Sequence, residues 1–374
     1  MRVRLSNLKR QYCSIREEIT SRMEMVMERQ DFILGSEVKE LESTMATIIG
    51  TEDAVGVSSG TDALLMCLMA EGIGQGDEVI VPGNSFIATV DAVCRVGATP
   101  VFVDIDKGKH TLSPDNFEKA ISARTKAVIP VHLFGRMVRN MDVIRKLADL
   151  NSIIVIEDAA QSILASYRGC KAGSMGHYGC LSFFPSKNLG CFGDGGMITT
   201  DRERAAKLRK IRVHGASSKY HHSCIGGNFR LDTLQAAVLL AKLPYLKEWT
   251  NRRIEIADQY CGAILGIGHG IKRPDTPWRS PEYKHVFNQF VVMFESKVIR
   301  DHVKSELKLA GIDTAIYYPV PLYKQECFGA VNSEHYPNSD ALSEKSLALP
   351  IYPELTNEEV QYVTKSFEEI ICSM

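Results

Sequence analysis

Long apolar runs are missing from this sequence of 374 residues. No stretch approaches the roughly 18 consecutive apolar residues that mark a membrane-spanning helix. The first ten residues, Met1–Arg10, carry basic side chains, but no apolar run follows them as it would in a secretory signal. These features argue against a membrane protein and predict a cytoplasmic location.

A strong charge of one sign and a metal-ligand spacing are missing as well. The 44 Lys and Arg residues nearly balance the 45 Asp and Glu residues, which gives a formal net charge of −1. No global field therefore favours nucleic acid or an anionic membrane as a partner. The ten cysteines include no Cys-x-x-Cys pair, so we expect no metal site and mostly buried, reduced thiols.

Short apolar, β-branched runs alternate with longer helical stretches over most of the chain. Such alternation predicts an α/β fold with a mainly parallel sheet covered by helices. The continuous apolar run at 152–156 is typical of a strand buried on both faces. The seven predicted strands are Ala54–Val57, Glu78–Pro82, Pro100–Asp104, Lys126–Val131, Ile153–Glu157, Cys180–Phe184 and Gly196–Thr200.

This alternation fades near residue 250, where glycine and proline become frequent. We therefore expect a large domain over 31–249 and a smaller α+β domain over 250–374, with an N-terminal helix in 1–30 packing with the small domain. Ser36 is expected to cap the next helix. In the small domain we expect a strand at His285–Phe294, a helix at Ser296–Ala310 and a last helix from about Thr356.

Lys187 stands in a short loop after an apolar strand, with Phe183-Phe184-Pro185 before it and Gly190 after it. An amine in a partly desolvated site has a lowered pKa and can attack a carbonyl carbon. Taken alone, the residue is better explained as an ordinary surface lysine. Its neighbours along the chain therefore decide how it is interpreted.

Asp158 and Phe86 each follow a predicted strand and are expected at its carboxyl end, where open α/β sheets bind their ligands. A carboxylate there can keep a pyridinium nitrogen protonated, as Asp does in pyridoxal 5'-phosphate (PLP) sites. The ring of Phe86 can stack on a flat cofactor. As isolated residues, Asp158 fits a helix N-cap equally well, and Phe86 would more often be core.

The segment Val57–Leu64 lies between a strand and a helix and contains Ser-Ser-Gly-Thr-Asp. Gly60 lets the backbone approach a ligand closely, and the first N–H groups of a helix are unpaired donors. Together they can hold a phosphate, to which the hydroxyls of Thr61 and Ser182 can add. On its own, the segment is better explained as a capped turn.

In this order, six motifs resemble the DegT/DnrJ/EryC1/StrS family of PLP-dependent sugar aminotransferases. Each motif is modest alone, and six in order over most of the chain are highly specific. The resemblance implies a fold type I aminotransferase that acts as a homodimer with shared active sites. The motifs are Ser-Ser-Gly-Thr-Asp-Ala-Leu (58–64), Pro-Val-His-Leu-Phe-Gly (130–135), Glu-Asp-Ala-Ala-Gln (157–161), Ser-Phe-Phe-Pro-Ser-Lys-Asn-Leu-Gly (182–190), Gly-Asp-Gly-Gly (193–196) and Gly-Gly-Asn-Phe-Arg-Leu-Asp-Thr-Leu-Gln-Ala-Ala (226–237).

Carried over by position, the resemblance implies two catalytic residues. Lys187 would form the Schiff base with PLP, and Asp158 would pair with the pyridine nitrogen. Gln161 is expected near the phenolic oxygen of the cofactor, and Phe86 over its ring. The residues expected to hold the phosphate are Gly60, Thr61, the backbone N–H of Asp62, Ser182 and Asn228 of the partner subunit.

Three further residues are expected near the substrate, namely His132, Tyr318 and Tyr323. His132 is explained equally well as a hydrogen-bonded core histidine. Tyr323 stands where the family often has histidine. That departure leaves the sugar contacts open without affecting the cofactor residues.

The implied reaction moves an amino group from an amino acid, with glutamate expected, to a nucleotide-linked keto-sugar. Lys187 argues against the family branch that has histidine there and dehydrates sugars. The segment Lys219–His222 is similar to members that aminate C3, which favours a 3-keto sugar, although it also fits a solvated loop. The alternatives are a 4-keto-sugar, aminocyclitol or aromatic-acid enzyme of the family, and a non-catalytic PLP-binding regulator.

Overall fold

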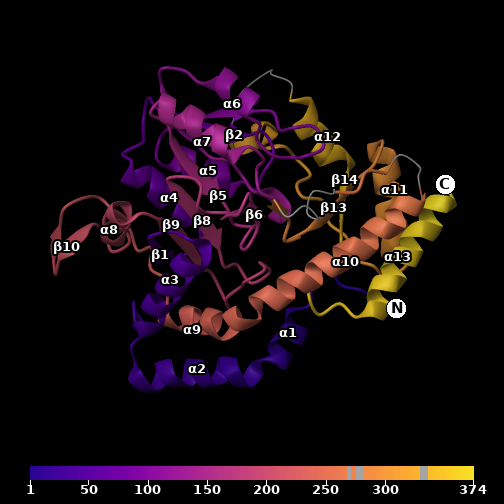
Figure 1. Ribbon diagram of the computed structural model, residues 1–374, viewed down its shortest axis with the longest axis horizontal. Helices are drawn as coiled ribbons and strands as arrows, with labels where there is room; N and C mark the ends of the chain where they lie inside the picture. The colour runs from indigo at the N-terminus through magenta and orange to yellow at the C-terminus, as the bar shows by residue number, and fades with distance from the viewer. Residues whose placement is uncertain (268–270, 275–281, 329–335) are drawn as a thin grey trace.

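A seven-stranded sheet forms the centre of the larger part of the molecule (Figure 1). The computed structural model describes residues 1–267, 271–274, 282–328 and 336–374. The strand order is β1-β9-β8-β5-β4-β2-β3; β9 runs antiparallel to both neighbours and the other pairs are parallel. This confirms the predicted α/β class. The strands are β1 (Asp53–Val57), β2 (Glu78–Pro82), β3 (Thr99–Val103), β4 (Thr125–Val128), β5 (Ile154–Asp158), β8 (Tyr178–Ser182) and β9 (Gly196–Thr200).

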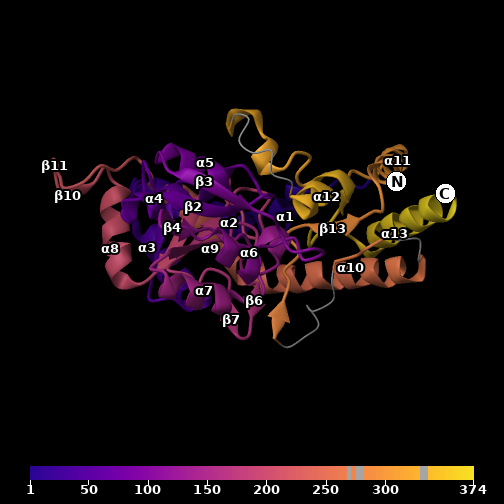
Figure 2. The ribbon, with the colours of Figure 1, turned by 90° about the horizontal axis from the view of Figure 1, so that it is seen from above.

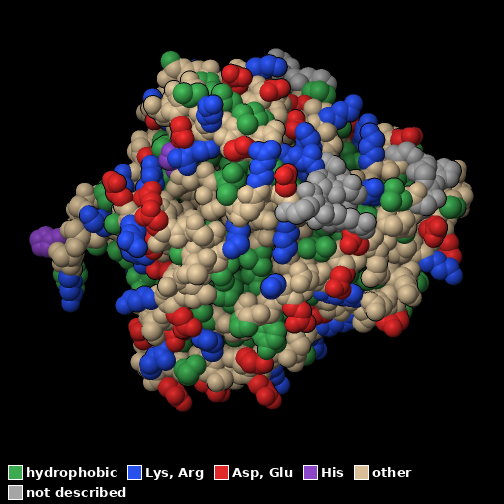
Figure 3. Space-filling model, in the orientation of Figure 1, with side chains coloured by type: hydrophobic (Ala, Val, Ile, Leu, Met, Phe, Trp, Pro, Cys, Tyr) green, Lys and Arg blue, Asp and Glu red, His purple; other side chains and the backbone are tan. Residues whose placement is uncertain are grey.

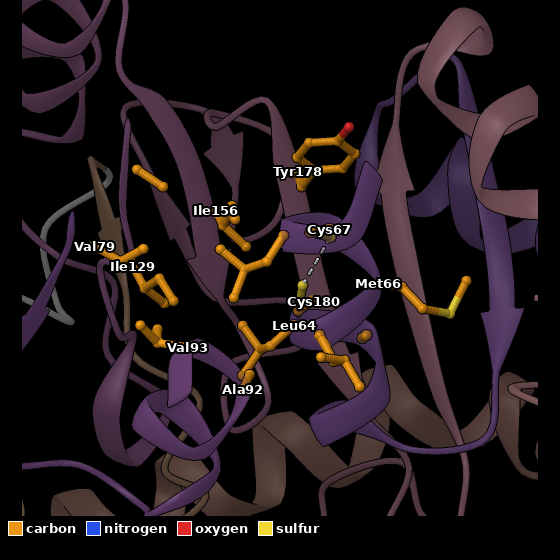
Figure 4. Close-up of a cluster of buried hydrophobic side chains, with 14 of the residues drawn as sticks. Leu64, Met66, Cys67, Val79, Ala92, Val93, Ile129, Ile156, Tyr178 and Cys180 are labelled. Atoms are coloured by element: carbon orange, nitrogen blue, oxygen red, sulfur yellow. Dashed lines mark hydrogen bonds between the residues drawn. The ribbon is translucent and has the colours of Figure 1, made fainter. Parts of the chain in front are cut away.

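Both faces of the sheet are covered by helices. Successive side chains of a strand point to opposite faces, so a strand that is apolar throughout presents apolar side chains to both. Ile156 packs with α4 (Gly60–Ala70), α5 (Ala88–Arg95) and α8 (Arg202–Ile211), a cluster partly drawn in Figure 4. Val155 belongs to the opposite face, which packs against α6 (Pro114–Ala120) and α7 (Met141–Leu150). Towards β1 that face is covered by α3 (Ser36–Ile49) and α9 (Thr233–Lys242). Gly35, not Ser36, occupies the N-cap of α3.

A second core lies at the C-terminal side and is reached along α10 (Leu246–Ile267), which crosses residue 250 without a break (Figure 1). The predicted domain boundary therefore falls inside a continuous helix, and the division into domains stays a prediction. The second core contains the antiparallel pair β13 (Phe290–Met293) and β14 (Ser346–Leu349). Its helices are α11 (Lys297–Leu309), α12 (Pro337–Lys345) and α13 (Asn357–Cys372), the last with a capping box at Thr356.

The N-terminal segment forms two helices that contact different parts of the chain. In α1 (Leu8–Ser14), Arg10 forms an ion pair of 2.6 Å with Glu359 of α13. In contrast, α2 (Arg16–Arg29) packs along α9. Residues 1–30 thus bridge the two cores instead of packing with the C-terminal one alone.

The strand expected at His285–Phe294 is shorter in the structure. Phe287 adopts a left-handed φ of 45°, which interrupts an extended strand, and the N–H of Val286 bonds to the carbonyl of Gly135. The chain pairs with β14 only from Phe290 onward.

The described residues also form short 3₁₀ turns. These are η1 (Leu133–Gly135), η2 (Leu243–Tyr245), η4 (Leu322–Lys324) and η5 (Glu326–Phe328).

Two further small sheets lie beside the seven-stranded sheet. A three-stranded sheet contains β6 (Ser166–Tyr167), β7 (Cys170–Lys171) and β12 (Tyr283–Lys284). The hairpin of β10 (Ala216–Ser218) and β11 (His221–His222) projects away from the rest of the molecule (Figures 1 and 2). On the face shown in Figure 3, acidic and basic side chains are interspersed. No helix within the described ranges is long and apolar enough to cross a membrane.

Gly179 of β8 lies where a side chain does not fit, because an added Cβ would overlap the Cα of Gly173. We expect Gly179→Ala to lower the free energy of unfolding by about 1–3 kcal/mol, the usual cost of overpacking. Gly262 in α10 is the matched control, since its added Cβ would meet no atom within 4 Å. Gly262→Ala should stabilise by about 0.5–1 kcal/mol. Equal urea midpoints for the two variants would contradict the packing argument.

Candidate active site

A cavity of about 450 Å³ opens at the carboxyl end of β5. Parallel strands of an open sheet place their ligand sites at this end. The walls come from the start of α4, the segment after β2, the end of β5, the loop after β8 and residues of the C-terminal part. Among the predicted site residues, the lining includes Gly60, Thr61, Phe86, His132, Asp158, Gln161, Ser182, Lys187 and Tyr318.

Lys187 reaches this cavity from the loop that follows β8. The backbone N–H of Lys187 donates to the carbonyl of Phe184 at 2.9 Å, which closes a tight turn and turns the side chain towards the sheet end. Burial lowers the pKa of Lys187 to about 8, and the charge of Asp158 acts in the opposite direction. A larger fraction of this amine is therefore neutral near pH 8 than in a free lysine, which makes it a better nucleophile.

Asp158 is held from two sides at the end of β5. The hydroxyl of Thr89 donates to Oδ2 at 2.8 Å, and the N–H of Ala160 donates to Oδ1 at 3.2 Å. The Thr89 oxygen is in turn 3.0 Å from the hydroxyl of Ser85. These hydrogen bonds fix the orientation of the carboxylate, which is only 6% exposed.

His132 lines the cavity, but both of its ring nitrogens are already bonded within the protein. Its Nδ1 accepts from the N–H of Val138 at 3.1 Å, so the proton is on Nε2, which donates to Glu157 at 2.7 Å. The side chain is fully buried. The expected substrate contact at His132 therefore does not fit this geometry, whereas the alternative of a hydrogen-bonded core histidine does.

The first turn of α4 forms a concave surface that suits a phosphate. Its N-terminal N–H groups, at Gly60 and Thr61, have no acceptor within the helix. An added Cβ on Gly60 would come within 2.8 Å of the Cβ of Ser182, so the close approach requires glycine. The N–H of Asp62 already donates to Ser59 at 3.0 Å, as the N-cap interaction of α4. Ser59 thus caps α4, and the N–H of Asp62, which was expected at the phosphate, is already bonded to this cap.

Aromatic rings flank the cavity on the side of the C-terminal part. The rings of Phe86 and Tyr318 have centroids 5.7 Å apart, and Phe86 is half exposed. The amide of Gln161 accepts from the N–H of Phe134 at 2.7 Å and donates to the Tyr318 hydroxyl at 3.1 Å. Gln161 therefore fixes Tyr318 at the cavity edge.

Tyr323 and Asn228 are placed away from the described residues that line this cavity. Tyr323 is 3% exposed, packs beside Phe102 and Tyr336, and donates to Asp340 at 2.6 Å. It does not make the expected substrate contact in this chain, because its ring fills the core. Asn228 is exposed, near the base of the β10–β11 hairpin.

Sequence reasoning missed several residues of the site, among them Ser59, Thr89, Gln289 and Tyr317. Ser59 was detectable as the polar residue before the first turn of a helix. Thr89 follows Ser85 by one helical turn, but nothing in that spacing shows that it points at Asp158. Gln289 and Tyr317 come from the C-terminal part, and only the tertiary fold brings them to the cavity.

A buried lysine, an oriented carboxylate and a helix N-terminus with unpaired N–H groups meet in one cavity of a mainly parallel α/β fold. This combination defines a PLP-dependent aminotransferase of fold type I. The chain belongs to the DegT/DnrJ/EryC1/StrS aminotransferase family, whose model matches residues 13–368. It is a PLP-dependent sugar aminotransferase.

Relatives and solved structures match almost the whole chain. The UDP-N-acetyl-3-dehydro-alpha-D-glucosamine 3-aminotransferase of Acidithiobacillus ferrooxidans is 43% identical, with 95% of this chain and 94% of the relative covered. A pleiotropic regulatory protein of Geobacillus stearothermophilus is 40% identical, covering 99% and 98%. The crystal structure of S. venezuelae DesV with a ketimine intermediate has a TM-score of 0.92 and 40% identity, covering 98% and 97%.

The lowered pKa of Lys187 predicts how the apoprotein captures PLP. The neutral amine is the reactive form, so the capture rate should rise with pH with a midpoint near 8, below the 10.5 of an ordinary lysine. Asp158→Asn removes the charge that raises this pKa and should move the midpoint to lower pH. Stopped-flow absorbance of PLP capture measures both. A midpoint above about pH 10 would be incompatible with the burial of Lys187.

Thr89 predicts a second effect on cofactor binding. Thr89→Val removes the hydroxyl that orients Asp158 and keeps the side-chain shape, so we expect PLP to bind about tenfold more weakly. Thr89→Ser keeps the hydroxyl and is the matched control, with an expected affinity close to wild type. Both constants come from absorbance titration of the apoprotein. If valine and serine bind PLP alike, the hydrogen bond does not position Asp158.

Proposed function

We propose that this aminotransferase moves an amino group from an amino acid, with glutamate as the natural donor, to C3 of a nucleotide-linked 3-keto sugar. The observation that carries the proposal is the shared cavity of Lys187 and Asp158 beside the first turn of α4. The name of the Acidithiobacillus relative favours C3 and a UDP-linked sugar. The exposed segment 219–222, which was linked to C3 amination by resemblance, supports the same position.

In this proposal PLP supplies an electrophilic carbon and a ring that accepts an electron pair. Lys187 holds the cofactor covalently. Its free Nζ would act first as the base that takes a proton from the α-carbon of the amino donor and then as the acid that gives that proton back. Asp158 keeps the ring nitrogen protonated, and its two hydrogen bonds hold it in place for that role.

The remaining residues bind and orient the cofactor. The N–H groups of Gly60 and Thr61 and the hydroxyl of Ser182 hold its phosphate in the concave first turn of α4. Phe86 would cover one face of the ring. Gln161, which bonds to the Tyr318 hydroxyl, would lie near the phenolic oxygen, and Tyr318 would face the sugar.

We also propose a homodimer in which Asn228 of the partner subunit completes the phosphate site. Two features support this. Asn228 is exposed and outside the described lining of its own cavity, and the neighbouring β10–β11 hairpin projects far from its own chain (Figure 2). A two-fold axis would let each hairpin base reach the site of the other subunit.

Two measurements test the proposed function. Borohydride should fix the cofactor to Lys187, and peptide mapping should find the label there, with Lys187→Ala as the unlabelled control. L-glutamate should then bleach the bound chromophore, and mass detection should find amination of UDP-linked or dTDP-linked 3-keto sugars from a panel that includes 4-keto sugars.

Several outcomes would overturn parts of this assignment. Label on another lysine would refute the catalytic role of Lys187. Amination of 4-keto sugars only would refute the C3 assignment. Bleaching by glutamate without turnover of any sugar would favour a regulatory role, in line with the name of the Geobacillus relative.

A further inference from the structure

A second, much smaller cavity of about 70 Å³ adjoins the cavity of Lys187. Ser186, Gln289 and Tyr317 line both cavities, so the two share a boundary. Ser186 precedes Lys187 in the chain. A group bound in the small cavity would therefore lie next to the reacting amine without occupying the main cavity.

Arg253 of α10 lines the small cavity and is 6% exposed. Its Nη1 donates to the carbonyls of Phe287 at 3.2 Å and Ile351 at 2.8 Å. Its Nε is buried and has no hydrogen-bond partner among the described residues. Burial lowers the pKa of Arg253 to about 10, while the charge of Glu354 acts in the opposite direction. The guanidinium is thus removed from water, and its two bonds to carbonyls replace only part of the hydrogen bonding that it had there.

Two other buried arginines of the described residues have carboxylate partners. Arg212 forms an ion pair of 2.6 Å with Glu42, and Arg300 forms one of 2.7 Å with Asp301. For Arg253, no carboxylate of the described residues lies within ion-pair distance. A buried charge without a partner is costly, and a bound anion would offset that cost.

Gln289 adds a matching feature on the boundary between the two cavities. Its side-chain Oε1 is buried and has no hydrogen-bond donor among the described residues. The lining of the small cavity therefore includes the cation Arg253, whose Nε lacks an acceptor, and Gln289, whose Oε1 lacks a donor. A zwitterionic α-amino acid carries the complementary pair, a carboxylate and an ammonium group.

We propose that Arg253 binds a carboxylate of the amino-acid donor and that Gln289 accepts a hydrogen bond from the donor's ammonium group. This inference rests on the amino-acid donor of the proposed function. The cavity is of the size of a carboxylate and has one cation on its wall. The diphosphate of a nucleotide sugar is larger and carries two charges, so it fits the small cavity poorly.

The test uses the holoenzyme and its variants Arg253→Gln and Arg253→Lys. The apparent Kd of L-glutamate is read from the first half-reaction without any sugar, and that of glutarate, a dicarboxylate without an amine, from calorimetry. We expect Arg253→Gln to weaken both by roughly ten- to one-hundredfold, the usual effect of losing a charged hydrogen bond. Arg253→Lys should lose less, and the affinity for UDP should not change.

Arg252 provides the matched control, since it precedes Arg253 on α10 and bonds to Leu355 and Asn357 on the surface. Arg252→Gln should leave both Kd values unchanged. Should Arg253→Gln fail to fold, Gln289→Met tests the same site without removing the bonds of Arg253 to the backbone. It should weaken L-glutamate and leave glutarate unaffected, because only glutamate carries the ammonium group.

Three results would overturn the inference. Unchanged Kd values with a lowered melting temperature would make Arg253 a structural residue. Weaker UDP binding with unchanged glutamate binding would assign the cavity to the nucleotide. Glutarate binding that is insensitive to Arg253 would place the carboxylate elsewhere. If no amino acid bleaches the wild-type chromophore but glutarate binding depends on Arg253, the carboxylate site stands and the proposed amino-acid donor fails.

Discussion

The buried carboxylate of Glu157 is the interaction on which the geometry of the site depends. It accepts from the ring of His132 at 2.7 Å and from the N–H groups of Gly173 and Met175 at 2.9 and 2.6 Å. A fully buried charge is tolerated because these donors replace water. Glu157 therefore ties β5 to two loops behind the sheet. Asp158 is the next residue of β5, and its side chain points to the opposite side. Because the backbone at Glu157 is held in place, the backbone at Asp158 is held as well.

The Lys187 loop is fixed in a comparable way from the other side. The buried amine of Lys242 on α9 donates to the carbonyl of Gly190 at 2.6 Å. The side chain of Asn188 donates to the carbonyl of Val286 at 3.1 Å, in the C-terminal part. The loop is thus held by α9 and by the segment before β13, so the position of the reacting amine depends on how that segment packs against the large core. This explains why a site built on strand ends also needs residues from beyond 280.

The sequence predicted best those features that repeat locally. All seven strands of the sheet were located, because apolar β-branched runs mark them regardless of partners. The positions of Lys187, Asp158 and Phe86 at the strand ends were predicted because motif order fixes them, while their roles towards the cofactor stay predictions. His132 and Tyr323 were interpreted less well, since each has a partner that sequence spacing does not reveal: Glu157 and Asp340, respectively. The bond from the Asp62 N–H to Ser59 follows the ordinary N-cap spacing and could have been expected. Tertiary hydrogen bonding, and not residue type, decides whether such a side chain faces a ligand.

An aminotransferase of this kind must admit two chemically different substrates to one reactive atom. A single cavity shaped for a sugar would bind a small amino acid weakly, because few contacts would be made. With the donor's carboxylate held by Arg253, recognition of the amino acid moves to a side cavity that a nucleotide sugar does not fill. Gln289 and Tyr317 line both cavities, so a change at either residue would affect the two half-reactions together. Arg253 lines only the small cavity, so a change there would affect the first half-reaction alone.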